Sequence, residues 1–160
     1  MAVYEPVSVD VTEKLEEVRV AHFTELGDAR IGVIFDTREK RKKFIAKIVK
    51  PNEILRYYTS DEAGEEDGYD YIIILDQIIW LSDGISDADR TRILRHELRH
   101  ADFKPEKKTR KGQYALKKHD VEDFYIEIEL AQQEGDGRWL ERVKITADSI
   151  YDMLEDRESV

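Results

Sequence analysis

The clearest candidate for chemistry is the segment from His96 to His100, which fits the pattern H-E-x-x-H. On a helix, side chains four residues apart lie one above the other, so the two histidines can bind one zinc ion. Glu97 falls beside them, where its carboxylate can take a proton from a water molecule that the metal activates. The pattern therefore predicts zinc-dependent hydrolysis, with His96 and His100 as ligands and Glu97 as the general base.

The helix that carries this pattern has two different faces. At about 100° per residue, one arc holds an apolar residue together with the three residues of the pattern, namely Ile93, His96, Glu97 and His100. The opposite arc is basic and contains Arg92, Arg95 and Arg99. We therefore expect the histidines to face inward and the arginines to form a solvated stripe. The alternative to metal binding is a pair of hydrogen-bonded core histidines.

A catalytic zinc site usually takes three protein ligands and leaves one position for water. The chain has 4 His and no Cys, so thiolate ligands and disulfides are excluded. His119 is the leading third ligand. Glu122, in the same segment K-K-H-D-V-E-D-F, is the alternative, because two His and one Glu suit zinc equally well. His22 falls near the end of the first expected helix and is interpreted as an ordinary, partly exposed residue.

The elements that must position these residues follow from apolar periodicity and turn residues. Helices are predicted over residues 10–26, 86–103, 120–133 and 139–156, with Ser86 as the cap of the second. Strands are predicted over residues 30–36 and 44–49, joined by the charged turn T-R-E-K-R-K-K, and over the apolar run 69–81. The polar segments 61–68 and 104–112 are predicted loops.

Composition narrows the class of protein. A length of 160 residues fits one domain, and a hydrophobic fraction of 41% is typical of a globular core. No run approaches the roughly twenty apolar residues of a membrane span, and no basic and apolar leader opens the chain, so we expect a soluble, cytoplasmic protein. A net charge of −10 does not favour nucleic acid as a direct ligand without a local basic patch. Nothing in the sequence indicates an oligomeric state.

The motifs R-H-E-L-R-H and H-D-V-E-D-F, in this order, resemble those of the small phage-type metallopeptidases, a zincin-like family. That family is marked by a D-H-E-L-x-H helix followed by an H-D-V-E-E-F segment, and the similarity runs from the N-terminal helix to Phe124. Two residues depart from this pattern. Arg95 stands where the family commonly has an acidic residue before the first His, and Asp123 stands where it has Glu. Other compact zincins similar to SprT-like proteins place a third His before an aromatic-containing helix, which favours His119 over Glu122.

The resemblance implies a compact α+β fold, a single zincin-like domain over residues 1–160. It implies a small mixed β-sheet packed with an N-terminal helix, the HExxH helix and C-terminal helices. It further implies a phage-related zinc metallopeptidase that cleaves peptides or proteins, with His96 and His100 binding the metal and Glu97 as the acid/base. In zincins the strand before the active helix lines the cleft, so an edge of residues 69–81 could pair with an extended peptide.

Several alternatives stay open at this stage. The protein could be a zinc-binding interaction module with weak or lost activity, or a hydrolase of non-peptide amides. Trp80 could line the cleft, although a large aromatic after an apolar strand is more often core. The lysines and arginines of loop 104–112 could favour acidic substrates, although a solvated loop is the simpler interpretation. An oxyanion donor is expected besides zinc, and Tyr114, Arg110 and Tyr125 are candidates.

Overall fold

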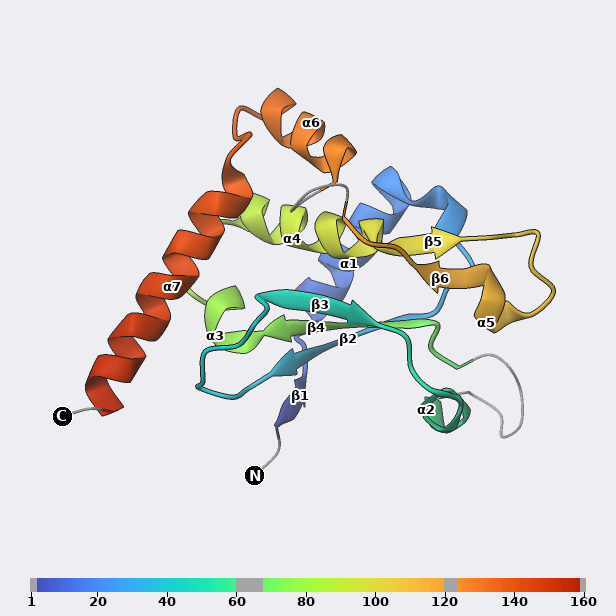
Figure 1. Cartoon of the computed structure of the whole chain (residues 1–160), viewed down its shortest axis with the longest axis horizontal. Coiled ribbons are helices and arrows are strands. Elements are labelled where there is room, and N and C mark those ends of the chain that lie inside the picture. The colour runs from blue at the N-terminus through green and yellow to red at the C-terminus, as the bar shows by residue number, and fades with distance from the viewer. Residues whose placement is uncertain (1–2, 60–67, 120–123, 159–160) are drawn as a thin grey trace.

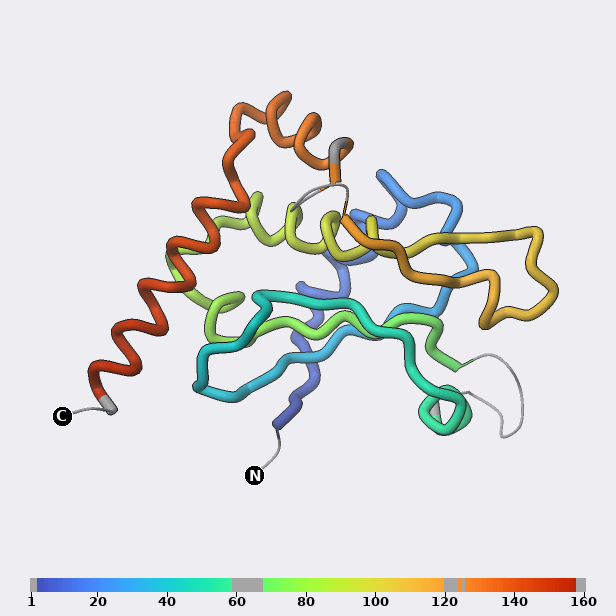
Figure 2. Tube along the Cα trace, viewed as in Figure 1, coloured from blue at the N-terminus to red at the C-terminus, as the bar shows by residue number. Residues whose placement is uncertain are grey.

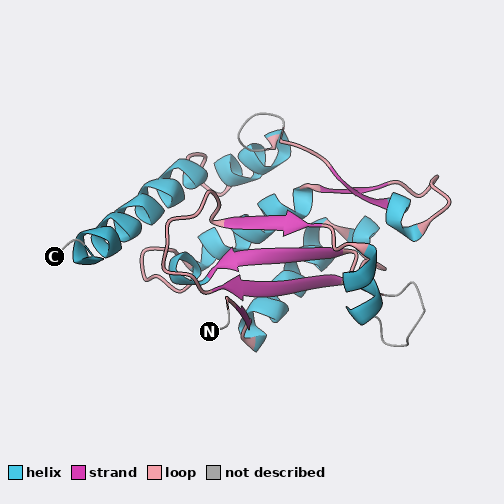
Figure 3. Ribbon diagram, turned by 60° about the horizontal axis from the view of Figure 1, so that its bottom comes forward, coloured by secondary structure: helices cyan, strands magenta, loops and turns pink. Residues whose placement is uncertain are grey.

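The computed structural model describes residues 3–59, 68–119 and 124–158. Within these ranges the chain forms a four-stranded mixed β-sheet, helices packed on it, and a separate two-stranded sheet (Figure 1). Helices α1 (Val9–His22) and α4 (Asp87–Arg99) lie together behind the sheet in Figure 3. The predicted α+β class, with a small mixed sheet, is confirmed.

The strand order of the main sheet places β1 and β3 at its two edges. The order is β1-β2-β4-β3, with bounds Tyr4–Pro6 for β1, Ile31–Asp36 for β2, Tyr71–Asp76 for β4 and Ala46–Val49 for β3. β2 and β4 are parallel, and the other two pairs are antiparallel. Both strands predicted at 30–36 and 44–49 exist, but they do not pair with each other, because β4 lies between them.

The apolar run predicted as one strand over 69–81 changes structure at Asp76. The carboxylate of Asp76 accepts hydrogen bonds from the backbone amides of Ile78 and Ile79, and it caps the short helix α3, Gln77–Trp80. Since β4 is paired on both sides, the expected pairing of a peptide with this strand was wrong. Trp80 is 3% exposed and belongs to the core, as the simpler interpretation held.

α1 begins one residue before the predicted start and buries Val11, Leu15 and Val18. A 3-10 turn, η1 (Thr24–Leu26), follows. The guanidinium of Arg19 donates to the carbonyls of Leu26 and Ala29, at 2.7 and 2.9 Å, and so fastens this turn to the helix. The predicted amphipathic helix is thus confirmed, with its last residues tightened into the 3-10 turn.

The helix with the H-E-x-x-H pattern begins where the sequence predicted. The Ser86 hydroxyl accepts from the amide of Asp89, while the Asp89 carboxylate accepts from the amide of Ser86, a complete capping box. The helix ends at Arg99, not at Phe103. Residues Ala101–Phe103 instead form β5, which pairs with β6, Tyr114–Leu116, as a hairpin that extends away from the main sheet (Figure 2).

The remaining helices are α2 (Glu53–Thr59), α5 (Arg110–Gln113), α6 (Tyr125–Gln133) and α7 (Trp139–Glu158). Gly135, with a φ of +81°, ends α6 and turns the chain into α7. The predicted start of α6 at Asp120 lies outside the described residues. No helix in the described part of the chain has both the length and the apolar character that a bilayer span requires.

Candidate metal centre

The structure brings His96, His100 and His119 together. Each residue offers one ring nitrogen, and these atoms all lie within 4.8 Å of one another. The Nε2 atoms of His96 and His119 are 2.8 Å apart, and the His119 ring centroid lies 4.6 Å from that of His96 and 4.4 Å from that of His100. In the described ranges, this is the group of side chains that could hold a metal ion. The sequence predicted the same three residues.

The β5–β6 hairpin places His119 beside α4. Directly after β6, the amide of Lys117 donates to the carbonyl of His100 at 2.7 Å. The carbonyl of Lys117 lies 2.6 Å from Nδ1 of the same histidine. A carbonyl can only accept, so this contact requires the proton on Nδ1, and in the neutral imidazole Nε2 is then the nitrogen with a lone pair for a ligand. This exchange of hydrogen bonds orients His100 and holds the segment before His119 next to the helix.

Aromatic side chains support the histidines. Phe124 is 3% exposed, and its ring centroid lies 5.6, 5.0 and 5.3 Å from those of His96, His100 and His119. Trp139, at the start of α7, lies 6.3 Å from His96. These contacts restrict the imidazoles to few orientations, which is what a preformed metal site requires.

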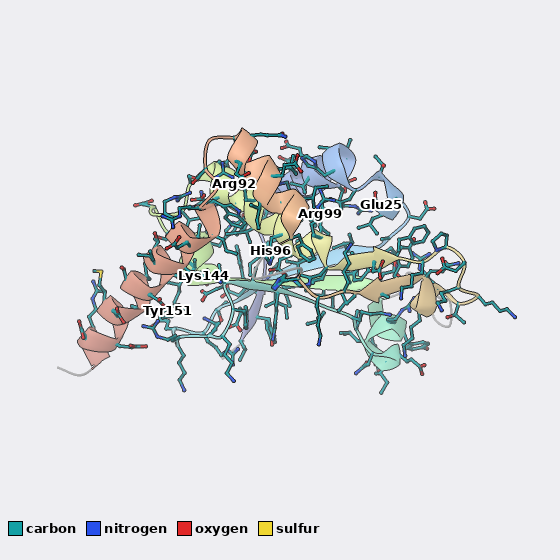
Figure 4. The ribbon with its side chains drawn as sticks, turned by 45° about the horizontal axis from the view of Figure 1, so that its top comes forward. Glu25, Arg92, His96, Arg99, Lys144 and Tyr151 are labelled. Carbon is teal, nitrogen blue, oxygen red and sulfur yellow. The ribbon has the colours of Figure 1, made fainter. Side chains whose placement is uncertain are left out.

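Glu97 and the three histidines line one groove of about 1060 Å³. His96 and Glu97 are each 7% exposed, whereas His119 lies at the open side. The groove runs between α7 on one side and the edge strand β3, with the segment before it, on the other; Figure 4 labels His96 on α4 and Lys144 and Tyr151 on α7. The groove thus combines a buried carboxylate with three imidazole nitrogens that could hold a metal ion.

The chain also matches a known protein family. The family described as "Putative phage metallopeptidase" matches residues 4–151. The chain belongs to this family. No curated protein and no solved structure matches it.

Membership of the phage metallopeptidase family suggests a metal-dependent peptidase, and such an enzyme implies a bound metal ion and a protein or peptide substrate. The three histidines are suitable ligands for such an ion. Imidazole is a ligand for zinc and for several other transition metals, and three imidazoles are close enough to share one ion.

Other residues considered for the site lie elsewhere. His22 is half-buried at the end of α1, and burial lowers its pKa below the usual value. Arg110 donates to Asp70 at 2.7 Å, and Tyr114 is buried against Tyr71, so neither lines the groove. Glu122, the alternative ligand, lies outside the described residues, as does the side chain of Tyr125.

The groove also contains a cluster that sequence analysis missed. Tyr151 donates a hydrogen bond to the buried carboxylate of Asp76, and Lys42 lies 2.8 Å from the Tyr151 hydroxyl and 3.2 Å from that carboxylate. Burial, followed by the hydrogen bond to Asp76, raises the pKa of Tyr151 well above its usual range. A polar Asp ending an apolar run was the available signal, but its partners are about 34 and 75 residues away. This cluster ties α7 to the sheet.

In this member of the phage metallopeptidase family, the basic face of α4 is buried. Arg92 and Arg95 are 5% and 3% exposed, so the expectation of a solvated stripe was wrong. Helix α6 lies beside this face (Figure 4). Its Glu127, 0% exposed, accepts from Nε of Arg95 at 2.9 Å and from Nε of Arg99 at 2.7 Å. Arg95 and Arg99 therefore pair with a buried carboxylate of α6.

The network continues toward α7. The carboxylate of Glu134 accepts from Arg92 and from both terminal nitrogens of Arg95, each at 3.1 Å. Asp89 accepts from Arg142 of α7 at 2.6 and 2.8 Å. Burial alone would raise the pKa of Asp89, but hydrogen bonds from Arg142 and Ser86 outweigh it and lower that pKa. The outer face of α4 is thus held by charge pairs to both C-terminal helices.

This network predicts acid sensitivity. Hydrogen bonds from Arg95 hold the pKa of Glu134 below its ordinary 4.5. A lowered carboxylate pKa contributes stability that is present above the ordinary pKa and is lost as pH falls through the lowered one. We expect the melting temperature to fall steeply below about pH 4.5. The Glu134→Gln variant should be less stable at pH 7 and should lose less on acidification; identical pH profiles would contradict the prediction.

Proposed function

We propose that the protein is a zinc-dependent peptidase in which His96, His100 and His119 bind the metal and Glu97 is the general base. One observation carries the proposal. Three imidazole nitrogens lie within 4.8 Å of one another in a groove that the buried carboxylate of Glu97 also lines. A structural zinc site usually has four protein ligands and needs no neighbouring base. Three histidines beside a carboxylate are the composition of a catalytic site.

The chemistry divides between the metal and the protein. Zinc bound to three imidazoles would supply a Lewis acid that polarises a peptide carbonyl and lowers the pKa of a water molecule to about 7. Glu97 takes the proton of the attacking water and returns it to the leaving amine. The carbonyl of Lys117 holds the Nδ1 proton of His100, which keeps that imidazole in one orientation. Phe124 and Trp139 exclude water from the inner side of the cluster.

The substrate is proposed to bind along β3. This strand is the last of the main sheet next to the groove, and Ala46, Lys47 and Ile48 line the groove. An extended peptide can add to such an edge through main-chain hydrogen bonds. We therefore propose that the peptide pairs with β3 and not, as the sequence had suggested, with residues 69–81. The scissile bond would lie where this path passes the three histidines.

The first experiment measures zinc per chain by elemental analysis on protein purified without an affinity tag. Wild type is expected to hold about one zinc ion, and His119→Ala is expected to lose it, because two imidazoles alone bind zinc weakly. His22→Ala is the matched control, since His22 lies outside the group that could hold a metal. Zinc retained by His119→Ala would move the third ligand to Glu122. A wild type without zinc, even after reconstitution, would overturn the proposal in favour of an interaction module.

A further inference from the structure

The groove has the opposite charge balance to the whole protein. The chain carries a net charge of −10, with 36 Asp and Glu against 26 Lys and Arg. The groove lining instead contains seven Lys and Arg against three carboxylates, those of Asp76, Glu97 and Asp148. Charges of one sign gathered in a cleft raise the local concentration of ligands with the other sign. The ligand of this groove is therefore expected to be anionic.

Two of the seven cations form ion pairs with carboxylates of the protein itself. Arg41 pairs with Asp148, Asp152 and Glu155 of α7, at 2.7, 2.7 and 3.1 Å. Lys42 pairs with Asp76, and its side chain is 4% exposed. These contacts join the segment before β3 to α7 and build the wall of the groove. Five further lysines line the groove.

The five lysines are exposed and come from three parts of the groove. They are Lys43 and Lys47 on the β3 side, Lys117 and Lys118 before His119, and Lys144 on α7, which Figure 4 labels. Of these, the first four form no ion pair with any residue in the described ranges. Lys47 lies 4.5 Å from the centroid of the Phe44 ring, a contact that leaves its charge intact. A peptide lying in the groove would therefore meet ammonium groups from β3, from α7 and from the segment before His119.

We infer that the groove selects acidic peptide segments, with Asp or Glu residues flanking the bond beside the histidines. This inference rests on the proposed peptidase function and names its substrate class. A peptide can place its carboxylates near the lysines and also pair its backbone with β3, which a nucleic acid cannot do. A nucleic acid would in addition extend beyond the groove and meet a predominantly acidic surface. The favourable contacts of a nucleic acid would therefore be limited to the lysines of the groove.

The inference is tested by binding, so that it does not depend on turnover. The zinc-loaded Glu97→Gln variant is titrated against two fluorescein-labelled peptides of equal length, one with Glu flanking a central apolar pair and one with Gln in the same places. We expect the acidic peptide to bind about tenfold more tightly at low ionic strength, with the difference shrinking as salt is added. Equal affinity, or tighter binding of the neutral peptide, would overturn the inference.

Charge reversals locate the effect. Adding Lys43→Glu and Lys47→Glu to this variant should bring the two affinities within about twofold, because both lysines line the groove. Lys107→Glu with Lys108→Glu makes the same charge change at exposed residues outside the groove, and it should leave the preference intact. A loss of preference that is equal in both pairs would show only a net-charge effect and would overturn the assignment to the groove. Tighter binding of a single-stranded oligonucleotide of equal charge would overturn the choice of peptide.

Cleavage assays separate this inference from the proposed function. Wild-type protein that cleaves both peptides equally well would leave the peptidase standing and remove the acidic preference. Selective binding of the acidic peptide by zinc-loaded wild type, without cleavage under any condition, would support the acidic preference and overturn the peptidase function. It would identify a binding groove for acidic segments in a protein that is no peptidase.

Discussion

Glu97→Gln is expected to lower peptide cleavage roughly 10³-fold while leaving the zinc content at the wild-type level. The substitution keeps the size of the side chain but removes its ability to take a proton from water. Glu97 is outside the group of nitrogens that could hold the metal, so zinc binding should not depend on its charge. The side chain is 7% exposed, and an amide can occupy the same space without disturbing α4. Cleavage of a fluorogenic peptide library and elemental analysis on the same sample measure the two effects.

The matched control is Glu129→Gln, which makes the same change at an exposed residue of α6. It should retain full cleavage. Undiminished cleavage by Glu97→Gln would remove this residue from the mechanism. Zinc lost together with activity would instead show that the carboxylate supports the metal, and the role of the base would then have to pass to another group.

Glu127→Leu is expected to cost about 3–5 kcal/mol of unfolding free energy. Glu127 is 0% exposed, and its two carboxylate oxygens accept from Arg95 and Arg99. Leucine has a similar volume but no acceptor, so the buried guanidinium of Arg95 and the half-buried one of Arg99 would each lose a partner. Breaking a buried pair in this way is far more destabilising than removing an exposed one, because the remaining charge cannot regain water.

Chemical denaturation of the zinc-free proteins gives this difference directly, free of any contribution from metal binding. Glu129→Leu, two residues along the same helix and exposed, should change stability by less than about 0.5 kcal/mol. A loss below about 1 kcal/mol for Glu127→Leu would mean that Glu134 alone compensates Arg95. It would also mean that α6 is held to α4 by other contacts.

The helix that carries H-E-x-x-H was predictable because its signals are local. The Ser86 cap and the spacing of H-E-x-x-H act within one helix, and Ser86 caps this helix as predicted. His119 was reached by elimination among 4 histidines and by family resemblance. The geometry now supports it through contacts with both other rings.

The errors concern partners that are distant in sequence. Arg95 looked solvated because helical periodicity reports which residues share a face but not what covers that face. Its partners Glu127 and Glu134 lie 32 and 39 residues further along the chain. The break of the apolar run at Asp76 was missed because apolar residues continue beyond it, so that the capping carboxylate of Asp76 was the main local signal. The three-residue strands β5 and β6 are too short to have a periodicity of their own.

The contacts of Arg41 have a consequence for the order in which the molecule folds. They join residues 107 to 114 positions apart, whereas His96 and His119 are 23 positions apart and Lys117 and His100 only 17. Closing a long loop costs more conformational entropy, so contacts that are local in sequence tend to form first. We expect a folding chain to gather its histidines before α7 docks on the segment ahead of β3. If the proposed function holds, an incompletely folded chain would have the three histidines together but would lack the α7 wall of the groove, which would delay cleavage until folding is complete.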